Sequence, residues 1–95
     1  MAAYVIVEIE IHDPELYKSY TKLTPSSIEA YKGKFIVRGG ETIVLEGDAS
    51  SKRNVILEFP SMELANSWWH SNDYSRAREI RQRAATTKMI IVKGV

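Results

Sequence analysis

The segment Ala3–Ile11 constrains the fold more than any other part of the chain, because its side chains alternate in character. One set of alternate positions is apolar and β-branched throughout: Val5, Val7, Ile9 and Ile11. The other set mixes apolar and acidic residues: Tyr4, Ile6, Glu8 and Glu10. Alternation of this kind predicts a β-strand with one face on a core and the other face partly polar.

Helical spacing follows this strand. Asp13 and Pro14 predict an N-cap and a proline in the first turn, and apolar residues then recur at helical intervals: Leu16, Tyr17, Tyr20 and Leu23. Pro25 predicts a kinked or two-part helix, with Thr24 capping the second part and Gly33 at its C-terminal end. A later helix is expected to begin at the cap Ser61, to break at residues 71–72 and to continue to about residue 84.

The remaining strands are predicted from β-rich runs. Residues 34–46, KFIVRGGETIVLE, hold two such runs around Gly39 and Gly40, and either a hairpin or a bend in one long strand fits them. The bend is preferred, because residues 47–52 make a better hairpin loop. Further strands are expected over residues 54–59, stopped by Pro60, and over residues 88–92.

The order strand, helix, strand, strand, helix, strand is that of the ferredoxin-like fold, a βαββαβ unit. It predicts a single α+β domain over residues 1–95, with a four-stranded antiparallel sheet and the helices on one face. The opposite sheet face has no layer of its own, although apolar side chains are expected on it: Tyr4, Ile6, Ile36 and Ile56. Since apolar surface of that extent needs cover, we expect a homodimer through the sheet faces.

Composition argues against several classes of partner. The chain has 13 basic and 12 acidic residues, so no strong field favours nucleic acid or an anionic membrane, and neither partner is expected. The N-terminal segment alternates like a strand and has no basic region of a signal peptide. The lack of cysteine fits a cytoplasmic protein, and no histidine or carboxylate cluster at metal-ligand spacing suggests a metal site.

Several short motifs occur in a defined order: R-G-G at residues 38–40, L-E-G at 45–47, E-F-P-S at 58–61, and then Trp68, Tyr74 and Arg81. Their order and spacing, from Tyr4 to Val95, resemble those of small bacterial proteins that form an uncharacterised domain family of the dimeric α+β barrel superfamily. The resemblance implies two ferredoxin-like subunits with their sheets packed face to face. The superfamily spans cofactor-independent and haem-degrading monooxygenases, muconolactone isomerases, chlorite dismutase-like proteins and stress-induced proteins, so the resemblance implies no single reaction.

Arg38, beside the glycine pair, is the most distinctive candidate for chemistry. Its guanidinium and the free backbone N–H groups of a glycine bend could hold a carboxylate or an enolate. Alternatively the glycines form a bulge, and Arg38 pairs with Glu58 or Glu8. Glu58 has apolar neighbours, an environment suited to a general base, but an ion pair with Arg38 or Arg53 at a dimer interface is the other interpretation.

The sequence Trp68-Trp69-His70 supports two interpretations. Consecutive helical residues point about a hundred degrees apart, so one tryptophan can lie in the core and the other at a rim. The trio would then form a pocket wall with His70 as acid, base or haem ligand, or it would be a core residue, an interface residue and a solvated helix end. The pattern of the haem-degrading relatives is not matched clearly, and no cofactor is expected.

Two functions therefore remain open. The first is a small-molecule-binding protein or cofactor-independent enzyme acting on a small anionic or aromatic metabolite. Its substrate-binding residues would lie between helices and sheet: Tyr20, Arg38, Trp68, Tyr74 and Arg81. Its catalytic candidates are Arg38, Glu58 and His70. The second is a non-catalytic homodimer, structural or stress-related. A cavity touching arginine and tyrosine favours the first function, and a filled core favours the second.

Overall fold

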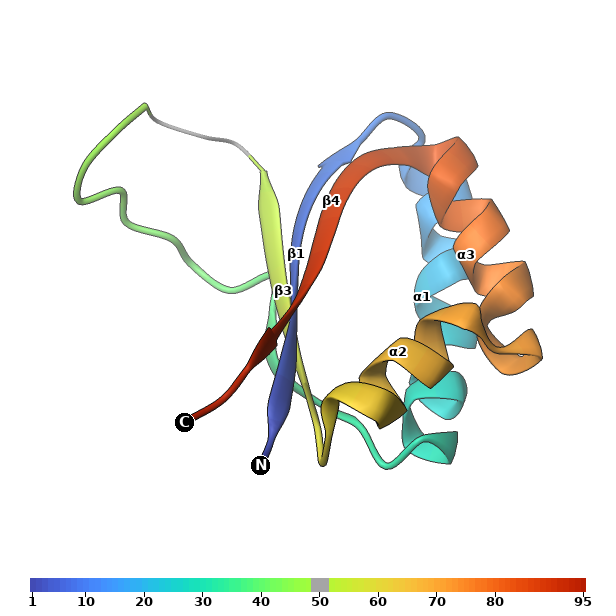
Figure 1. Cartoon of the computed structure of the whole chain (residues 1–95). Coiled ribbons are helices and arrows are strands. Elements are labelled where there is room, and N and C mark those ends of the chain that lie inside the picture. The colour runs from blue at the N-terminus through green and yellow to red at the C-terminus, as the bar shows by residue number, and fades with distance from the viewer. Residues whose placement is uncertain (49–51) are drawn as a thin grey trace.

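Seven elements make up the fold in the computed structural model, which describes residues 1–48 and 52–95. In chain order they are β1 (Ala3–Ile11), α1 (Pro14–Ala30), β2 (Lys34–Arg38), β3 (Arg53–Phe59), α2 (Met62–His70), α3 (Asn72–Ala84) and β4 (Ala85–Lys93). The strands form one antiparallel sheet in the order β2-β3-β1-β4, and the helices lie on one side of it (Figure 1). The expected ferredoxin-like α+β fold is confirmed.

Alternate side chains of β1 lie on opposite faces of the sheet, as their pattern in the sequence predicts. Val5 and Val7 point toward the helices and are almost completely buried, opposite Leu57 and Val55 of β3. Ile6 has the opposite parity and lies on the outer face between two isoleucines, one from β3 and one from β4. Large apolar side chains on or beside this outer face stay more than a third exposed: Ile36, Val37, Ile90 and Val92.

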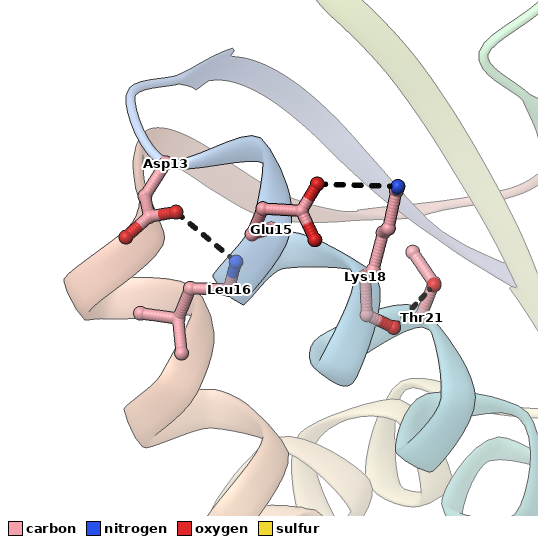
Figure 2. A network of polar contacts seen from close by, with 5 residues as sticks. All are labelled: Asp13, Glu15, Leu16, Lys18 and Thr21. Atoms are coloured by element: carbon pink, nitrogen blue, oxygen red, sulfur yellow. Dashed lines mark hydrogen bonds and ion pairs between the residues drawn. The ribbon is translucent and has the colours of Figure 1, made fainter.

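Helix α1 begins as expected and then departs from the prediction. The Asp13 side chain accepts a hydrogen bond from the Leu16 backbone N–H at 3.1 Å, and Glu15 pairs with Lys18 in the first turn (Figure 2). The helix then runs as one element across Pro25, so the expectation of a two-part helix was wrong. Instead of capping a second part, Thr24 donates its hydroxyl to the Tyr20 carbonyl at 2.7 Å and remains inside the helix.

The end of α1 also differs from the prediction. The left-handed residue is Lys32, with φ of 64°, and not Gly33. Gly33 has another role, because a Cβ at this position would lie 2.5 Å from the Phe59 ring and 2.8 Å from Ile28. The backbone at this position therefore lies too close to core side chains for any residue larger than glycine.

The long bent strand expected over residues 34–46 is not observed. β2 ends at Arg38, and residues 39–48 contain no strand and run away from the sheet (Figure 1). The irregularity lies before the glycines, because Phe35 pairs with Leu57 but Val37 already pairs with Ile56. This β-bulge changes the parity of the strand and brings Phe35 and Arg38 onto the helix-covered face. The hairpin loop expected over residues 47–52 lies partly outside the described residues.

The second helical region breaks at residue 71, as predicted. Ser61 caps α2 and Ser71 caps α3, each by accepting a backbone N–H at 3.1 Å. β4 starts directly after α3 at Ala85, three residues before its expected beginning. Within the described ranges no helix is long and apolar enough to cross a membrane.

Candidate functional site

A narrow pocket opens between α1 and the sheet. Its walls are mainly apolar side chains of β1, β3 and β4, with Trp68 and Phe35 as aromatic surfaces. Helix α1 contributes two tyrosines and two threonines, and two arginines complete the lining: Tyr17, Tyr20, Thr21, Thr24, Arg38 and Arg53. The free volume is about 30 Å³, which is space for about two water molecules. In this state the pocket can receive one end of a small molecule.

Neither arginine of the pocket has an ion pair with an acidic side chain of the described residues. The Arg38 guanidinium lies over the Phe35 ring, with its central carbon 4.2 Å from the ring centre. The Arg53 Nε atom is buried and has no hydrogen-bond partner among the described residues. Glu58 pairs with Lys34 at 3.3 Å, so the pair between Arg38 and Glu58 considered from the sequence is not formed. The pocket therefore has a net positive charge.

A hydrogen-bonded chain runs from the pocket into the core. The hydroxyl groups of Tyr20 and Tyr74 lie 2.8 Å apart, and Arg81 donates from Nε to the Tyr74 hydroxyl at 3.1 Å. Arg81 also donates to the Thr87 hydroxyl, and only 3% of its surface is exposed. Burial, and then the neighbouring Tyr74, raise the pKa of Tyr20 well above its usual value, so its hydroxyl stays protonated at neutral pH.

The tryptophan wall is held by a second set of hydrogen bonds. Trp68 is fully buried, and its indole N–H donates to the Ser27 hydroxyl at 3.1 Å. Ser27 in turn donates to the Thr24 carbonyl at 2.7 Å. Stacking on Tyr74, with ring centres 4.1 Å apart, fixes the other side of the indole. Trp68 therefore serves as a rigid wall with its polar atom already satisfied.

Residues 2–95 match the model of a domain of unknown function, DUF1330. The chain belongs to this family. No curated protein matches it.

Solved structures share the fold of this DUF1330 chain at low sequence identity. A protein of unknown function from Rhodopseudomonas palustris is 21% identical with a TM-score of 0.77, over 99% of this chain and 82% of its own. A dimeric ferredoxin-like protein of unknown function from Jannaschia sp. is 8% identical with a TM-score of 0.72, over 99% and 100%. A cofactor-independent oxygenase from Streptomyces nogalater is 10% identical with a TM-score of 0.67, over 99% and 93%.

The structure brings most of the candidate residues of this DUF1330 protein to one place. Tyr20, Arg38 and Trp68 line the pocket, and Tyr74 and Arg81 stand behind Tyr20 in the hydrogen-bonded chain. The other two candidates lie elsewhere. Glu58 alternates to the outer sheet face opposite Tyr4, and His70 is exposed at the end of α2, where its Nδ1 contacts the Asn66 carbonyl at 3.0 Å.

Sequence reasoning missed two pocket residues, Tyr17 and Arg53. Arg53 shares the parity of Val55 and Leu57, so a charged residue at a core-facing strand position was the signal that could have revealed it. Burial raises the pKa of Tyr17, and nearby Arg53 partly offsets this effect. Arg53 therefore lies close enough to Tyr17 to influence its ionisation, and both residues line the pocket.

Metal ligands are not grouped in the described part of the chain. No set of three or more histidine and carboxylate side chains there could hold a metal ion. Two larger hollows, of about 280 and 470 Å³, are open grooves beside β4. His70 and Arg81 border these grooves, one each. Neither groove combines apolar walls with unpaired arginines as the α1 pocket does.

Proposed function

We propose that this DUF1330 protein binds a small anionic or aromatic metabolite in the α1 pocket, as a binding protein or a cofactor-independent enzyme. The observation that carries the proposal is the pair of arginines, Arg38 and Arg53, at a mainly apolar pocket without a carboxylate partner among the described residues. Arg38 is exposed at the end of β2, whereas the Nε atom of Arg53 is buried, and a charged N–H group removed from water without a partner is costly. An anionic ligand would offset this cost, and the apolar walls and Trp68 would hold its body.

The side chains that line the pocket are suited to binding an anion. They are less suited to general-base catalysis by a carboxylate. The described residues that line the pocket include no aspartate, glutamate or histidine. Tyr17 and Tyr20 have raised pKa values, so both hydroxyls are protonated near neutral pH and neither is available as a base. In an enzyme of this design the arginines would stabilise negative charge that develops on the substrate. The cofactor-independent oxygenase from Streptomyces nogalater, which shares the fold, supports this option by analogy.

A second copy of the chain is part of the same proposal. The outer sheet face carries Ile6 and Ile56 at its centre, with Ile90 and Val92 exposed beside them. Among the described residues no layer covers this face. Neighbours from Jannaschia sp. and Bacteroides fragilis are described as dimeric, which supports a homodimer through the sheet faces. A stable interface of this kind buries about 1,000 Å² or more in total.

One observation favours a second function, a non-catalytic homodimer with a structural or stress-related role. The free volume of about 30 Å³ is far below that of most ligand pockets. In this alternative the arginines and tyrosines only set the packing of the helices on the sheet.

A thermal-shift screen against a metabolite library separates the two functions. A ligand that binds only the native state raises the melting temperature. We expect small organic anions to stabilise the wild type and to stabilise Arg38→Met less. An Arg76→Met variant, which changes an exposed arginine of α3, is the matched control and should respond like the wild type. A library without any stabilising compound would favour the structural function.

A further inference from the structure

We infer that Arg53 holds the carboxylate of a short aliphatic monocarboxylate whose chain enters the apolar interior of the pocket. The inference rests on the proposed function and names its ligand class. In this inference the main polar contact of the ligand is made by Arg53, a residue that the sequence motifs did not indicate.

The position of Arg53 follows from strand geometry. It is the first residue of β3 and has the same parity as Val55 and Leu57, so its side chain extends over the helix-covered face. Its Nε atom is shielded from solvent but has no hydrogen-bond partner within residues 1–48 and 52–95. A buried donor of this kind loses its bonds to water without replacement. A carboxylate oxygen in the pocket would accept this hydrogen bond.

Gly39 explains how the guanidinium is held in place. Its φ of 68° lies in the left-handed region, and its N–H donates to the Asn54 carbonyl at 2.8 Å, which keeps the backbone close to β3. A Cβ on Gly39 would overlap Nη1 and Cζ of Arg53. The glycine therefore leaves a flat backbone surface against which the guanidinium lies. Gly39 is a positioning residue for Arg53, and this contact accounts for the first glycine of the R-G-G motif.

The neighbours of Arg53 restrict the class of anion. Arg38 lies on the Phe35 ring, and so one arginine of the pair already has a cation–π partner. The Tyr17 hydroxyl is protonated at neutral pH, because burial raises its pKa, and Arg53 is close enough to offset part of this rise. One unpartnered guanidinium N–H and one neutral hydroxyl suit a planar monoanion better than a phosphate, which needs more donors.

The shape of the interior restricts the rest of the ligand. Behind the arginines the walls are aliphatic or aromatic, with Val7, Ile28 and Leu57 among them. Only about 30 Å³ is free. This space accepts a thin aliphatic tail, whereas an aromatic ring needs a cavity several times larger. The ligand class is therefore a short, unbranched monocarboxylate.

Sodium butyrate and butyramide are matched probes, because they share a chain and differ in charge. Both are added to the full chain at constant ionic strength with sodium chloride, and binding is followed by thermal shift and calorimetry. Butyrate should raise the melting temperature by about 5 °C or more at roughly 20 times its Kd, and butyramide should have little effect. Across a series from acetate to octanoate, affinity should be highest near about four carbons, as the free volume suggests.

Variants test the role of Arg53 directly. Arg53→Met should weaken butyrate binding by about tenfold or more, because a charge-assisted hydrogen bond is lost. Gly39→Ala should weaken it as well, by displacing the guanidinium, while Gly40→Ala is the matched control, with no atom within 4 Å of the added Cβ. Should Arg53→Met fail to fold, Arg53→Lys keeps the charge but not the fork and should still bind several-fold more weakly.

The outcomes separate this inference from the proposed function. Unchanged butyrate affinity in Arg53→Met or Arg53→Lys would overturn the assignment to Arg53. Equal stabilisation by butyramide and butyrate would overturn the carboxylate class and leave a binding pocket in place. If other metabolites bind and no monocarboxylate does, the inference fails alone. If nothing binds, both fail.

Discussion

The hydroxyl of Tyr20 lies 2.8 Å from the hydroxyl of Tyr74, and this contact joins the pocket to a buried arginine. Tyr74 also accepts a hydrogen bond from Arg81, whose charge has no ion-pair partner among the described residues. α1 and α3 are thus connected through the protein interior by polar groups. A network of this kind stabilises the fold only if each member keeps its partner.

Tyr74→Phe should therefore reduce stability by about 1–3 kcal/mol, because it leaves the Arg81 Nε and the Tyr20 hydroxyl without a partner in the core. Urea denaturation of the wild type and the variant measures this change. Tyr31→Phe removes a hydroxyl from a half-buried tyrosine just after α1 and serves as control. Equal losses in both variants would contradict a special role for the network.

Alkaline pH should weaken the fold through Tyr20. Its pKa in the folded protein is raised, mainly by burial, so the folded state holds this proton more tightly than the unfolded state does. The resulting stability is complete below the unfolded value of about 10 and decreases as pH rises above it. We expect the free energy of unfolding to fall as the pH rises above about 10, and to fall less steeply in Tyr20→Phe. Parallel pH curves for the two proteins would argue against this linkage.

Arg38→Met should change stability by less than about 1 kcal/mol, since Arg38 contacts the Phe35 ring and has no ion pair with Glu58. The second variant in this test is Glu58→Gln, which removes the partner of Lys34 and should also have a small effect because that pair is partly exposed. The double variant should be additive in chemical denaturation. Rescue of a strongly destabilised Arg38→Met by Glu58→Gln would instead indicate that the two residues are coupled.

Ile6→Asp should abolish the proposed homodimer, because Ile6 lies on the outer face between Ile56 and Ile90. Burying an unpaired carboxylate there would cost several kcal/mol. Sedimentation at micromolar concentration should show a dimer for the wild type and a monomer, or an unfolded chain, for the variant. Glu10→Asp changes an exposed residue of the same strand face and should remain dimeric. A dimeric Ile6→Asp protein would place the interface elsewhere.

Gly33→Ala should destabilise the fold by about 1–3 kcal/mol, because the added methyl group would lie 2.5 Å from the Phe59 ring and neither side can move freely in the core. Thermal unfolding measures the effect. Gly40→Ala introduces the same methyl group into open space and should leave stability nearly unchanged. A stable Gly33→Ala protein would show that the backbone after α1 can shift to make room for the methyl group.

Local patterns in the sequence determined much of this fold. The alternation of Ala3–Ile11 assigned both faces of β1, and Asp13 and Ser61 marked helix starts, because a cap depends on residues three positions apart. The break at residues 71–72 was also predicted, and the structure shows that Ser71 caps α3 there. Helical spacing predicted that one tryptophan of the Trp68-Trp69 pair could lie in the core, and the structure shows that it is Trp68. Each of these features depends on a residue and its near neighbours in the chain.

Tertiary structure decided what depends on segments far apart. The bulge in β2 follows from its pairing with β3, and it turned Arg38 toward the pocket. The strand then ends at Arg38, although the β-rich sequence favoured a longer one. The unpartnered Nε of Arg53 and its contact with Gly39 exist only because β3 and the end of β2 lie side by side. Register and packing across the sheet place these groups, and local propensity carries no information about which distant residues will meet.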